Sequence, residues 1–368
     1  MKRALTYFLS ALISVSCIYP FDIDTEQYSG NTLVIDGNIV IGGSSTVRLS
    51  RLTIIGEQKS PERIVATVTL EGEKGQSLTR DSEPYTFNTA DWDPDCRYRL
   101  VVKEKDKVYT STWTKPLEAP KITSIDFDAD ETMVYVRMSA QASGDGQGYA
   151  SAQYDEIWRF HTDYLRIFEY DPESNSVYPI QDPDGPDMTY YVCWRKQTGW
   201  QNLIIDYSAT NGVISSYPIA MFPRKSNRNH YEYKIMVKLR TLPEEEYRYR
   251  KQLESGQNIG SLFSPEPGSA PTNIICESDP SVKIFGYVSI SRQDYYIATL
   301  DSRYLLYGNP GGLDVIEPDQ YQSYYHMGYL PVNYTPTGEI GWGSPRCYNC
   351  VADGGTLEEP SFDIPKGE

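Results

Sequence analysis

The feature that most constrains the fold is a series of short segments in which apolar and polar residues alternate. Between residues 31 and 118 these segments follow one another closely, separated by turns rich in Gly, Asp, Lys and Pro. A period of two places every second side chain on the same face of a strand. The segments with this character are 33–41, 46–52, 64–70, 85–87, 98–102 and 108–113. Their number and spacing predict an N-terminal β-sandwich of the immunoglobulin or transthyretin-like kind over residues 31–118.

The rest of the chain, residues 119–368, predicts a larger and less regular β-rich domain. Pro116 and Pro120 mark the boundary, and the length of 368 residues suits two domains of about 100–200 residues each. Strand-like segments occur at 122–127, 133–138, 156–161, 190–194, 231–239 and 284–290. The sequence therefore predicts a mainly β protein with two domains.

One short helix is expected in the second domain, at about residues 243–254. Thr241 and Glu244 have the spacing of a capping box, and Gly256 follows the predicted end. The apolar face is thin, with Leu242, Tyr249 and Leu253. Such a helix is expected to pack on the edge of a β domain.

The N-terminus predicts export and lipid attachment. Two basic residues are followed by the apolar run 4–13 and then by small residues that precede Cys17. This pattern is typical of a secretory signal, and the cysteine after the small residues makes it similar to a bacterial lipoprotein signal, in which the thiol is acylated. The apolar run is too short for a spanning helix, which needs about 20 residues. We expect residues 1–17 to be the signal with lipidated Cys17, and residues 18–30 to be a tether; an ordinary cleaved signal with an incidental cysteine is the alternative.

The charge balance excludes some classes of partner. Fifty acidic residues oppose 34 basic ones, for a net charge of −16. Nucleic-acid binding needs clustered Lys and Arg, and an anionic membrane surface attracts basic segments, so neither is expected here. The 31 tyrosines suit strand faces and also contact surfaces.

Cysteines are the main candidates for a structural site. The second domain contains four of them: Cys193, Cys276, Cys347 and Cys350. In an oxidising compartment they predict two disulfides, with three possible connectivities. The alternatives are a four-cysteine zinc site, for which a second C-x₂-C pair is missing, and free thiols. Cys96, in the first domain, is expected to be a buried thiol.

A thioredoxin-like redox role for Cys347 and Cys350 requires the pair at the N-terminus of a helix. Pro345 precedes the pair and Gly354-Gly355 follow it, which argues against a helix there. The sequence therefore disfavours this role.

Other constellations give no assignable chemistry. The acidic segment 182–187 has carboxylates around a glycine, as calcium loops do, but its prolines break the EF-hand pattern and favour a solvated loop. The three histidines, His161, His230 and His326, lie in no recognised catalytic motif. No catalytic residue, metal ligand or cofactor is assigned.

Several motifs carry a family resemblance by their order along the chain. They include the strand from Val34 to Gly37, then Glu156-x-Trp158, Cys193-Trp194, Gly260-Ser261-Leu262-Phe263, Pro265-x-Pro267, Asn273-Ile274, Phe285-Gly286-Tyr287-Val288, Cys347-Tyr348-Asn349-Cys350, Gly354-Gly355-Thr356 and Pro360. The series resembles a family of Bacteroidota outer-membrane lipoproteins known as domain of unknown function four-two-four-nine, over essentially the whole mature chain. One departure is the Ser361-Phe362-Asp363 ending, where family members more often have an aromatic pair with Trp.

The resemblance implies a location and a partner rather than a reaction. Such lipoproteins tend to be encoded beside TonB-dependent outer-membrane transporters, and no reaction is established for them. We therefore expect a non-enzymatic accessory or binding lipoprotein of the outer membrane, associated with a TonB-dependent transporter in nutrient uptake, whose ligand the sequence does not identify. The alternative is a surface hydrolase acting on glycans or peptides, with a deep pocket in the second domain lined by carboxylates or by the histidines.

Overall fold

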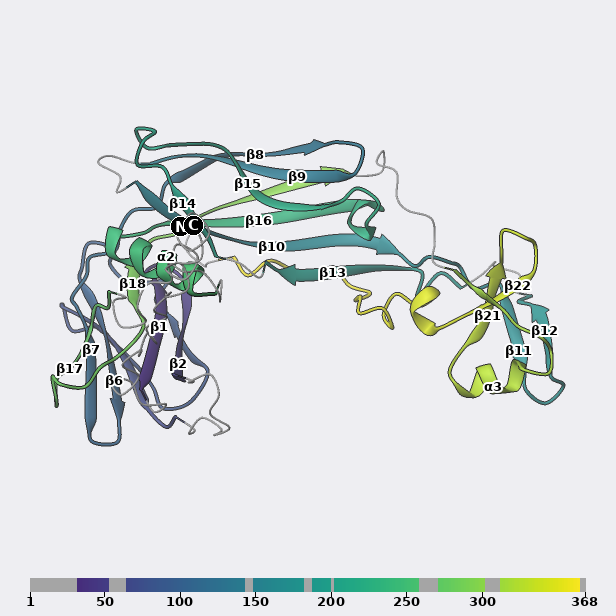
Figure 1. Ribbon diagram of the computed structural model, residues 1–368, viewed down its shortest axis with the longest axis horizontal. Coiled ribbons are helices and arrows are strands. Elements are labelled where there is room, and N and C mark those ends of the chain that lie inside the picture. Colours follow the sequence, from purple (N-terminus) through teal and green to yellow (C-terminus); the bar gives the residue numbers. More distant parts are fainter. Residues whose placement is uncertain are drawn as a thin grey trace, which may run out of the picture.

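The protein consists of three lobes in a row, each with its own hydrophobic core (Figure 1). The computed structural model describes residues 32–52, 64–142, 148–181, 187–199, 202–257, 271–301 and 312–364. We call the lobes the N-terminal sandwich, the central sandwich and the distal lobe. The predicted mainly β class is confirmed. Among the described residues, no helix is long and apolar enough to cross a membrane.

The N-terminal sandwich is built from two sheets with the strand orders β18-β1-β2-β5 and β17-β7-β6-β3-β4. The alternation of apolar and polar residues explains how these strands pack. Along β2, exposed and buried side chains alternate, so one face of the strand enters the core. The strands are β1 (Leu33–Val40), β2 (Ser44–Arg51), β3 (Thr67–Gly72), β4 (Ser77–Arg80), β5 (Tyr85–Asn88), β6 (Tyr98–Glu104), β7 (Lys107–Ser111), β17 (Ile274–Cys276) and β18 (Val288–Ser291).

Two of these strands come from far downstream in the sequence. β18 pairs in parallel with β1, with Gly37 opposite Val288, and β17 pairs with β7. Gly286 enables the close approach, since its φ is +109° and a Cβ there would lie 1.9 Å from the carbonyl oxygen of Ile35. The segment 31–118 thus supplies most of the sandwich, and residues 274–291 complete it.

The central sandwich packs a four-strand path, β13-β10-β16-β19, with β14 also paired to β10, against the sheet β15-β9-β8. Large apolar residues fill the space between the sheets, including Trp158, Phe160 and Tyr233, each at most 1% exposed. The strands are β8 (Lys121–Ala129), β9 (Met133–Gln141), β10 (Tyr149–His161), β13 (Val192–Thr198), β14 (Leu203–Asp206), β15 (Val213–Pro223), β16 (Glu232–Thr241) and β19 (Asp294–Asp301).

The distal lobe was not anticipated as a separate unit within residues 119–368. Two stretches of chain form it, one between β10 and β13 and one after residue 312. Its small core is aromatic, with Tyr170 and Trp342 buried beside Ile316. The elements are β11 (Phe168–Asp171), β12 (Ser176–Pro179), β20 (Asp314–Val315), α3 (Tyr321–His326), β21 (Leu330–Tyr334) and β22 (Ile340–Gly343).

The C-terminal tail runs from the distal lobe back along the central sandwich (Figure 1). It follows β13, the edge strand of its sheet, where Thr356 pairs with Trp194. Three ion pairs hold it there: Asp353 with Arg195, Glu359 with Lys234, and Asp363 with Lys196. The tail therefore covers an edge that would otherwise be open to pairing with another chain.

The chain enters the N-terminal sandwich at the end that faces away from the central sandwich. Leu33, at the start of β1, is paired with Arg51, and Arg51 forms an ion pair with Glu104 at the β6–β7 hairpin. Beyond the opposite end of β1, Ser44 lies with Lys238 of β16 around a shared cavity. Leu33, close to the first described residue, thus lies at the end of this sandwich opposite to the end that meets the central sandwich.

The predicted helix is confirmed as α2 (Glu244–Gln257), but its packing face differs from the expected one. Thr241 does not cap it: this residue ends β16, and its hydroxyl donates to the carbonyl of Glu118. Leu253 is 47% exposed, whereas Tyr249 is 4% exposed. The buried face is partly ionic.

Glu246, on that face, links the N-terminal and central sandwiches. It is fully buried and bonded to Arg240 of β16 at 2.6 Å and to Arg250 at 2.8 Å. Arg250 in turn lies 3.5 Å from Asp36 of β1. Burial alone would raise the pKa of Glu246, but the two arginines outweigh it and lower the pKa below its ordinary value.

We predict that Glu246→Gln destabilises the protein strongly, because it leaves buried Arg240 without its anionic partner. Breaking such a pair costs about 3–5 kcal/mol, measured as a shift of the urea unfolding midpoint. The matched control is Glu244→Gln, which removes the exposed pair with Arg248 and is expected to cost about 0.5 kcal/mol or less. Equal effects of the two substitutions would contradict the prediction.

Candidate functional site

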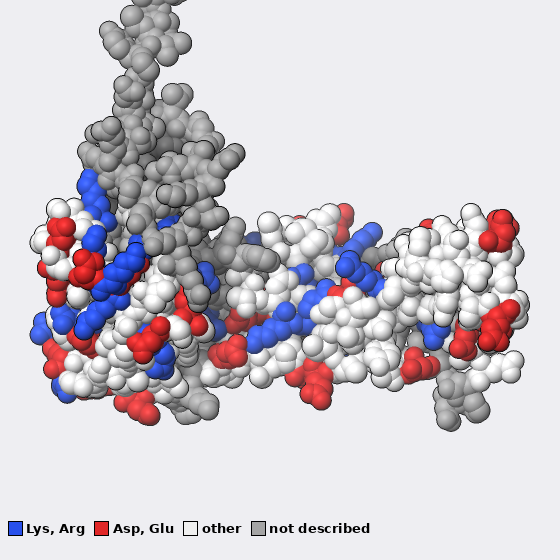
Figure 2. Space-filling view, turned by 90° about the horizontal axis from the view of Figure 1, so that it is seen from below, with Lys and Arg blue, Asp and Glu red and all other residues white. Residues whose placement is uncertain are grey.

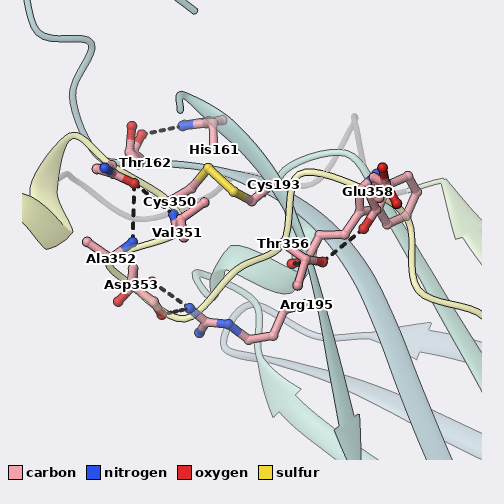
Figure 3. The surroundings of a disulfide bond; sticks show 12 residues. His161, Thr162, Cys193, Arg195, Cys350, Val351, Ala352, Asp353, Thr356 and Glu358 are labelled. Carbon is pink, nitrogen blue, oxygen red and sulfur yellow. Dashed lines mark hydrogen bonds and ion pairs between the residues drawn. A yellow bond between two sulfur atoms is a disulfide. The ribbon is translucent and has the colours of Figure 1, made fainter. Parts of the chain in front are cut away.

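The neck, where the central sandwich meets the distal lobe, is closed by a disulfide between Cys193 and Cys350 (Figure 3). Cys193 is on β13 and Cys350 is in the C-terminal tail, 157 residues later, with a Cα–Cα distance of 5.7 Å. Both sulfurs belong to fully buried residues. Arg195 adds a second link, since it donates to the Asp353 carboxylate at 2.7 Å and lies over the Phe160 ring at 4.8 Å. The neck therefore joins the tail to β13 by a covalent bond and an ion pair.

The other three described cysteines are free thiols, so the expected second disulfide is wrong. Cys276 is on β17, in the core of the N-terminal sandwich, and its sulfur lies 3.3 Å from the Ser278 hydroxyl. Cys96 is buried in the same core, as expected. Cys276 thus lies in another lobe than Cys193, Cys347 and Cys350, and two of these three are joined in the disulfide, which overturns the four-cysteine zinc alternative.

Cys347 remains near the disulfide and is only partly buried. It ends a short 3-10 helix, Pro345–Cys347, where the sequence argued against any helix. Pro345 at the first position is compatible with a helical turn because its missing N–H would have no intrahelical partner.

Two of the three candidate histidines meet at the neck. The rings of His161 and His230 stack with their centroids 4.0 Å apart, and the ring of Tyr191 stacks on His161 at 5.3 Å. The backbone N–H of His161 donates to Nδ1 of His230 at 3.2 Å. Burial, followed by the nearby His161, lowers the pKa of His230 to about 4. His326 is exposed on α3 of the distal lobe and takes no part in this cluster.

A cavity of about 210 Å³ opens beside the histidine pair. Its lining combines His161 and His230 with Lys225, Arg346 and the Cys347 thiol. Pockets for drug-sized ligands usually measure about 300–1,000 Å³, so the cavity suits only a small polar group. Two acids, Asp163 and Asp353, also line the cavity, and Asp353 is bound by Arg195. The acidic segment 182–187 of the calcium alternative lies, apart from Asp187, outside the described residues, as does Cys17.

The distal lobe presents an apolar patch that the sequence did not localise. We define the distal patch as Tyr325, Met327 and Tyr334, which are 38%, 62% and 52% exposed. Tyr325 packs on Tyr170, and Tyr334 packs on Phe168. Phe168 and Tyr170 are two residues apart and lie on the same face of β11. The patch is thus supported from beneath by buried rings.

The distal lobe carries more acidic than basic groups on the face that Figure 2 shows. In Figure 2 the distal lobe, at the right, is largely uncharged with acidic groups around it, whereas basic groups gather over the central sandwich. The described acids of the lobe are Glu169, Asp171, Glu173, Asp187, Asp314, Glu317, Asp319 and Glu339.

Comparison with known proteins places the chain in a family without an assigned activity. The family model described as "Domain of unknown function (DUF4249)" matches residues 18–296. None of the curated proteins matches the chain. Among solved structures, a two-domain fibronectin type III segment of chicken tenascin is 9% identical, with 56% of this chain and 90% of that chain covered and a TM-score of 0.17. The CBD12 segment of CALX1.2 is 11% identical, with 73% and 100% covered and a TM-score of 0.17.

We predict that His230 makes stability rise with pH. Its pKa of about 4 in the folded protein lies below the unfolded value of about 6.5, so the unfolded chain binds more protons between these values. Stability is then lost as pH falls from 6.5 towards 4, by at most about 1.4 kcal/mol per pH unit. His230→Gln should reduce this slope in urea unfolding series between pH 4 and 7, whereas His326→Gln, at an exposed position, should leave it unchanged. If neither substitution changed the pH dependence of the free energy of unfolding, His230 would not be its source.

Proposed function

Because the chain belongs to the family described as domain of unknown function DUF4249, whose model matches residues 18–296, we propose that it is a lipid-anchored envelope protein. In this proposal it holds its distal lobe against a membrane partner, a TonB-dependent outer-membrane transporter, and acts as a non-enzymatic accessory or binding component. Cys17 carries the anchor, and residues 18–30 are the tether.

The order of the lobes is the observation that carries the proposal. The chain enters the N-terminal sandwich at Leu33, beside the β6–β7 hairpin, and the other two lobes extend from the opposite end (Figure 1). A flexible tether of about 13 residues has an end-to-end distance of roughly 20 Å, from about 5–6 Å × √n. The N-terminal sandwich would then stay close to the membrane surface and serve as a stand for the other lobes.

The chemistry of the distal patch supports a protein partner. Tyrosine and methionine are enriched in protein interfaces, where rigid rings give contact area at low cost in conformational entropy. The acids of the distal lobe favour a partner surface with Lys and Arg, through complementary charge. In this proposal the partner surface that meets the distal lobe is basic.

A surface hydrolase acting on glycans or peptides is the second candidate. Its support is the neck cavity, where the His161 and His230 rings and the Cys347 thiol meet. Turnover of a glycan or peptide library that is lost in His161→Ala would favour this candidate over the accessory role.

We predict that Cys17→Ser removes the protein from the membrane fraction. Without the thiol no acyl chain can be attached, and each buried methylene contributes about 0.8 kcal/mol to membrane binding. Metabolic labelling with palmitate and detergent phase partitioning measure the change, with Cys347→Ser as the matched control that keeps the label. Undiminished labelling of Cys17→Ser would rule out this anchor.

We predict that serine at Tyr325, Met327 and Tyr334 together reduces capture of the transporter by at least tenfold. A loss of about 1.4 kcal/mol of binding energy corresponds to tenfold, and truncating one central aromatic residue often costs more than that. Crosslinking of intact membranes followed by affinity purification measures the captured barrel. Met221→Ser, at a 69% exposed position on β15 of the central sandwich, is the control and should capture as the unmodified protein does. Equal capture by both variants would place the interface elsewhere.

A further inference from the structure

The C-terminal tail pairs with only one residue of the edge strand β13. Trp194 and Thr356 exchange two backbone hydrogen bonds, both at 2.8 Å. Because the backbone groups of every second residue of a strand point to the same side, those of Lys196 and Thr198 face this edge as well. Within the described chain, the tail makes no backbone hydrogen bond with either residue. The edge therefore offers two further residues to a strand that pairs along its whole length.

The outer face of the sheet beside this edge presents two lysines with an isoleucine between them. Lys196 of β13, Ile157 of β10 and Lys234 of β16 are register partners, so they form one row across three strands. The row faces away from the core, because Tyr233 and Ile235, the neighbours of Lys234 along β16, belong to the core. Ile157 is nevertheless only 1% exposed. The row is therefore covered on its outer side.

The tail is bound to this row mainly by charge. The Lys234 ammonium lies 2.5 Å from Glu359, and the Lys196 ammonium lies 2.9 Å from Asp363. Lys196 also donates to the carbonyl of Ser361 at 2.9 Å. The side chains of the two acids are 46% and 85% exposed. Exposed ion pairs contribute little to stability and weaken with salt, so this part of the tail is easily displaced.

We propose that the β13 edge and the adjoining lysine row form a binding site for an extended acidic segment of another protein. Residues 357–364, which we call the strap, occupy this site until that segment displaces them. The strap shows the chemistry that the site accepts, namely an extended chain with carboxylates placed on the two lysines. A segment that also pairs with the backbone of Lys196 and Thr198 gains hydrogen bonds that the strap lacks, as in other cases of strand addition.

The attachment of the strap favours a different protein over a second copy of this chain. Cys350 joins the tail to Cys193 shortly before the strap begins, so the strap has a high effective concentration at its own site. The tail of a second copy would make the same contacts without this advantage. Only a segment with additional contacts competes. The site is on the central sandwich, so this inference does not depend on the function proposed for the distal lobe.

The test measures how tightly the full chain carrying Cys17→Ser binds a fluorescein-labelled peptide with the sequence of residues 354–364. Glu359→Gln combined with Asp363→Asn weakens the strap and leaves the site intact. Fluorescence anisotropy should show that this strap-weakened protein binds the peptide at least tenfold more tightly than the parent does. Binding should also weaken as the salt concentration rises, because the ion pairs are screened.

Matched substitutions show whether the lysine row is the site. In the strap-weakened protein, the further change of Lys196→Gln with Lys234→Gln should abolish the gain in binding. Lys74→Gln, which removes an exposed pair with Asp93 in the N-terminal sandwich, should preserve it. Circular dichroism and urea unfolding check that each variant is folded. A peptide whose acids are replaced by their amides should bind at least tenfold more weakly.

Hydrogen exchange separates strand pairing from attraction between charges alone. The bound peptide should slow exchange of the amides of Lys196 and Thr198, measured by mass spectrometry. The proposal is overturned if the strap-weakened protein binds no more tightly than the parent, if the lysine substitutions leave binding unchanged, or if these amides gain no protection. A dimer of the strap-weakened protein in analytical ultracentrifugation would assign the site to a second copy of the chain and contradict the choice of a different protein.

Discussion

The relation between the first two lobes depends on a buried carboxylate that must be paired. An uncompensated charge at the position of Glu246 would be too costly to bury, and its partners come from two elements, Arg240 on β16 and Arg250 on α2 itself. Arg250 reaches Asp36 on β1 as well. The pair with Arg240 holds α2 against the central sandwich, and the Arg250–Asp36 pair joins the same helix to the N-terminal sandwich. The distal lobe extends from the far end of the central sandwich, so its distance from the start of β1 depends on the same joint.

Features encoded by neighbouring residues could be predicted from the sequence. The alternation in 46–52 gives β2 because the side-chain period of a strand is visible in any short window, and the charge pattern of 244–251 gives α2 for a similar reason. The packing of the helix could not be predicted in this way. The pattern of apolar residues predicts that Leu253 is buried, yet the buried side chains of the helix are Glu246 and Tyr249. The surface against which the helix packs supplies an arginine as well as apolar groups.

Features that depend on pairing between distant residues left no local trace. The segment 284–290 reads as a strand, but nothing in it shows that β18 belongs beside β1. Four cysteines allow several pairings, and only the fold separates Cys276, in the N-terminal sandwich, from Cys193 and Cys350. The stacking of His161 on His230 arises in the same way, since β10 and the segment after β15 converge only in three dimensions. The separation of the distal core from the central core likewise follows from an insertion whose ends meet at the neck.

The parallel pairing of β1 with β18 also sets the order in which the protein can fold as it is synthesised. A chain that emerges from its N-terminus presents β1 long before Val288 is available, and until then one edge of its sheet is uncovered. Contacts with such large sequence separation slow folding, because the loop between them must be closed first. The lobe nearest the N-terminus is therefore finished among the last, and during that interval its strands require protection from other chains.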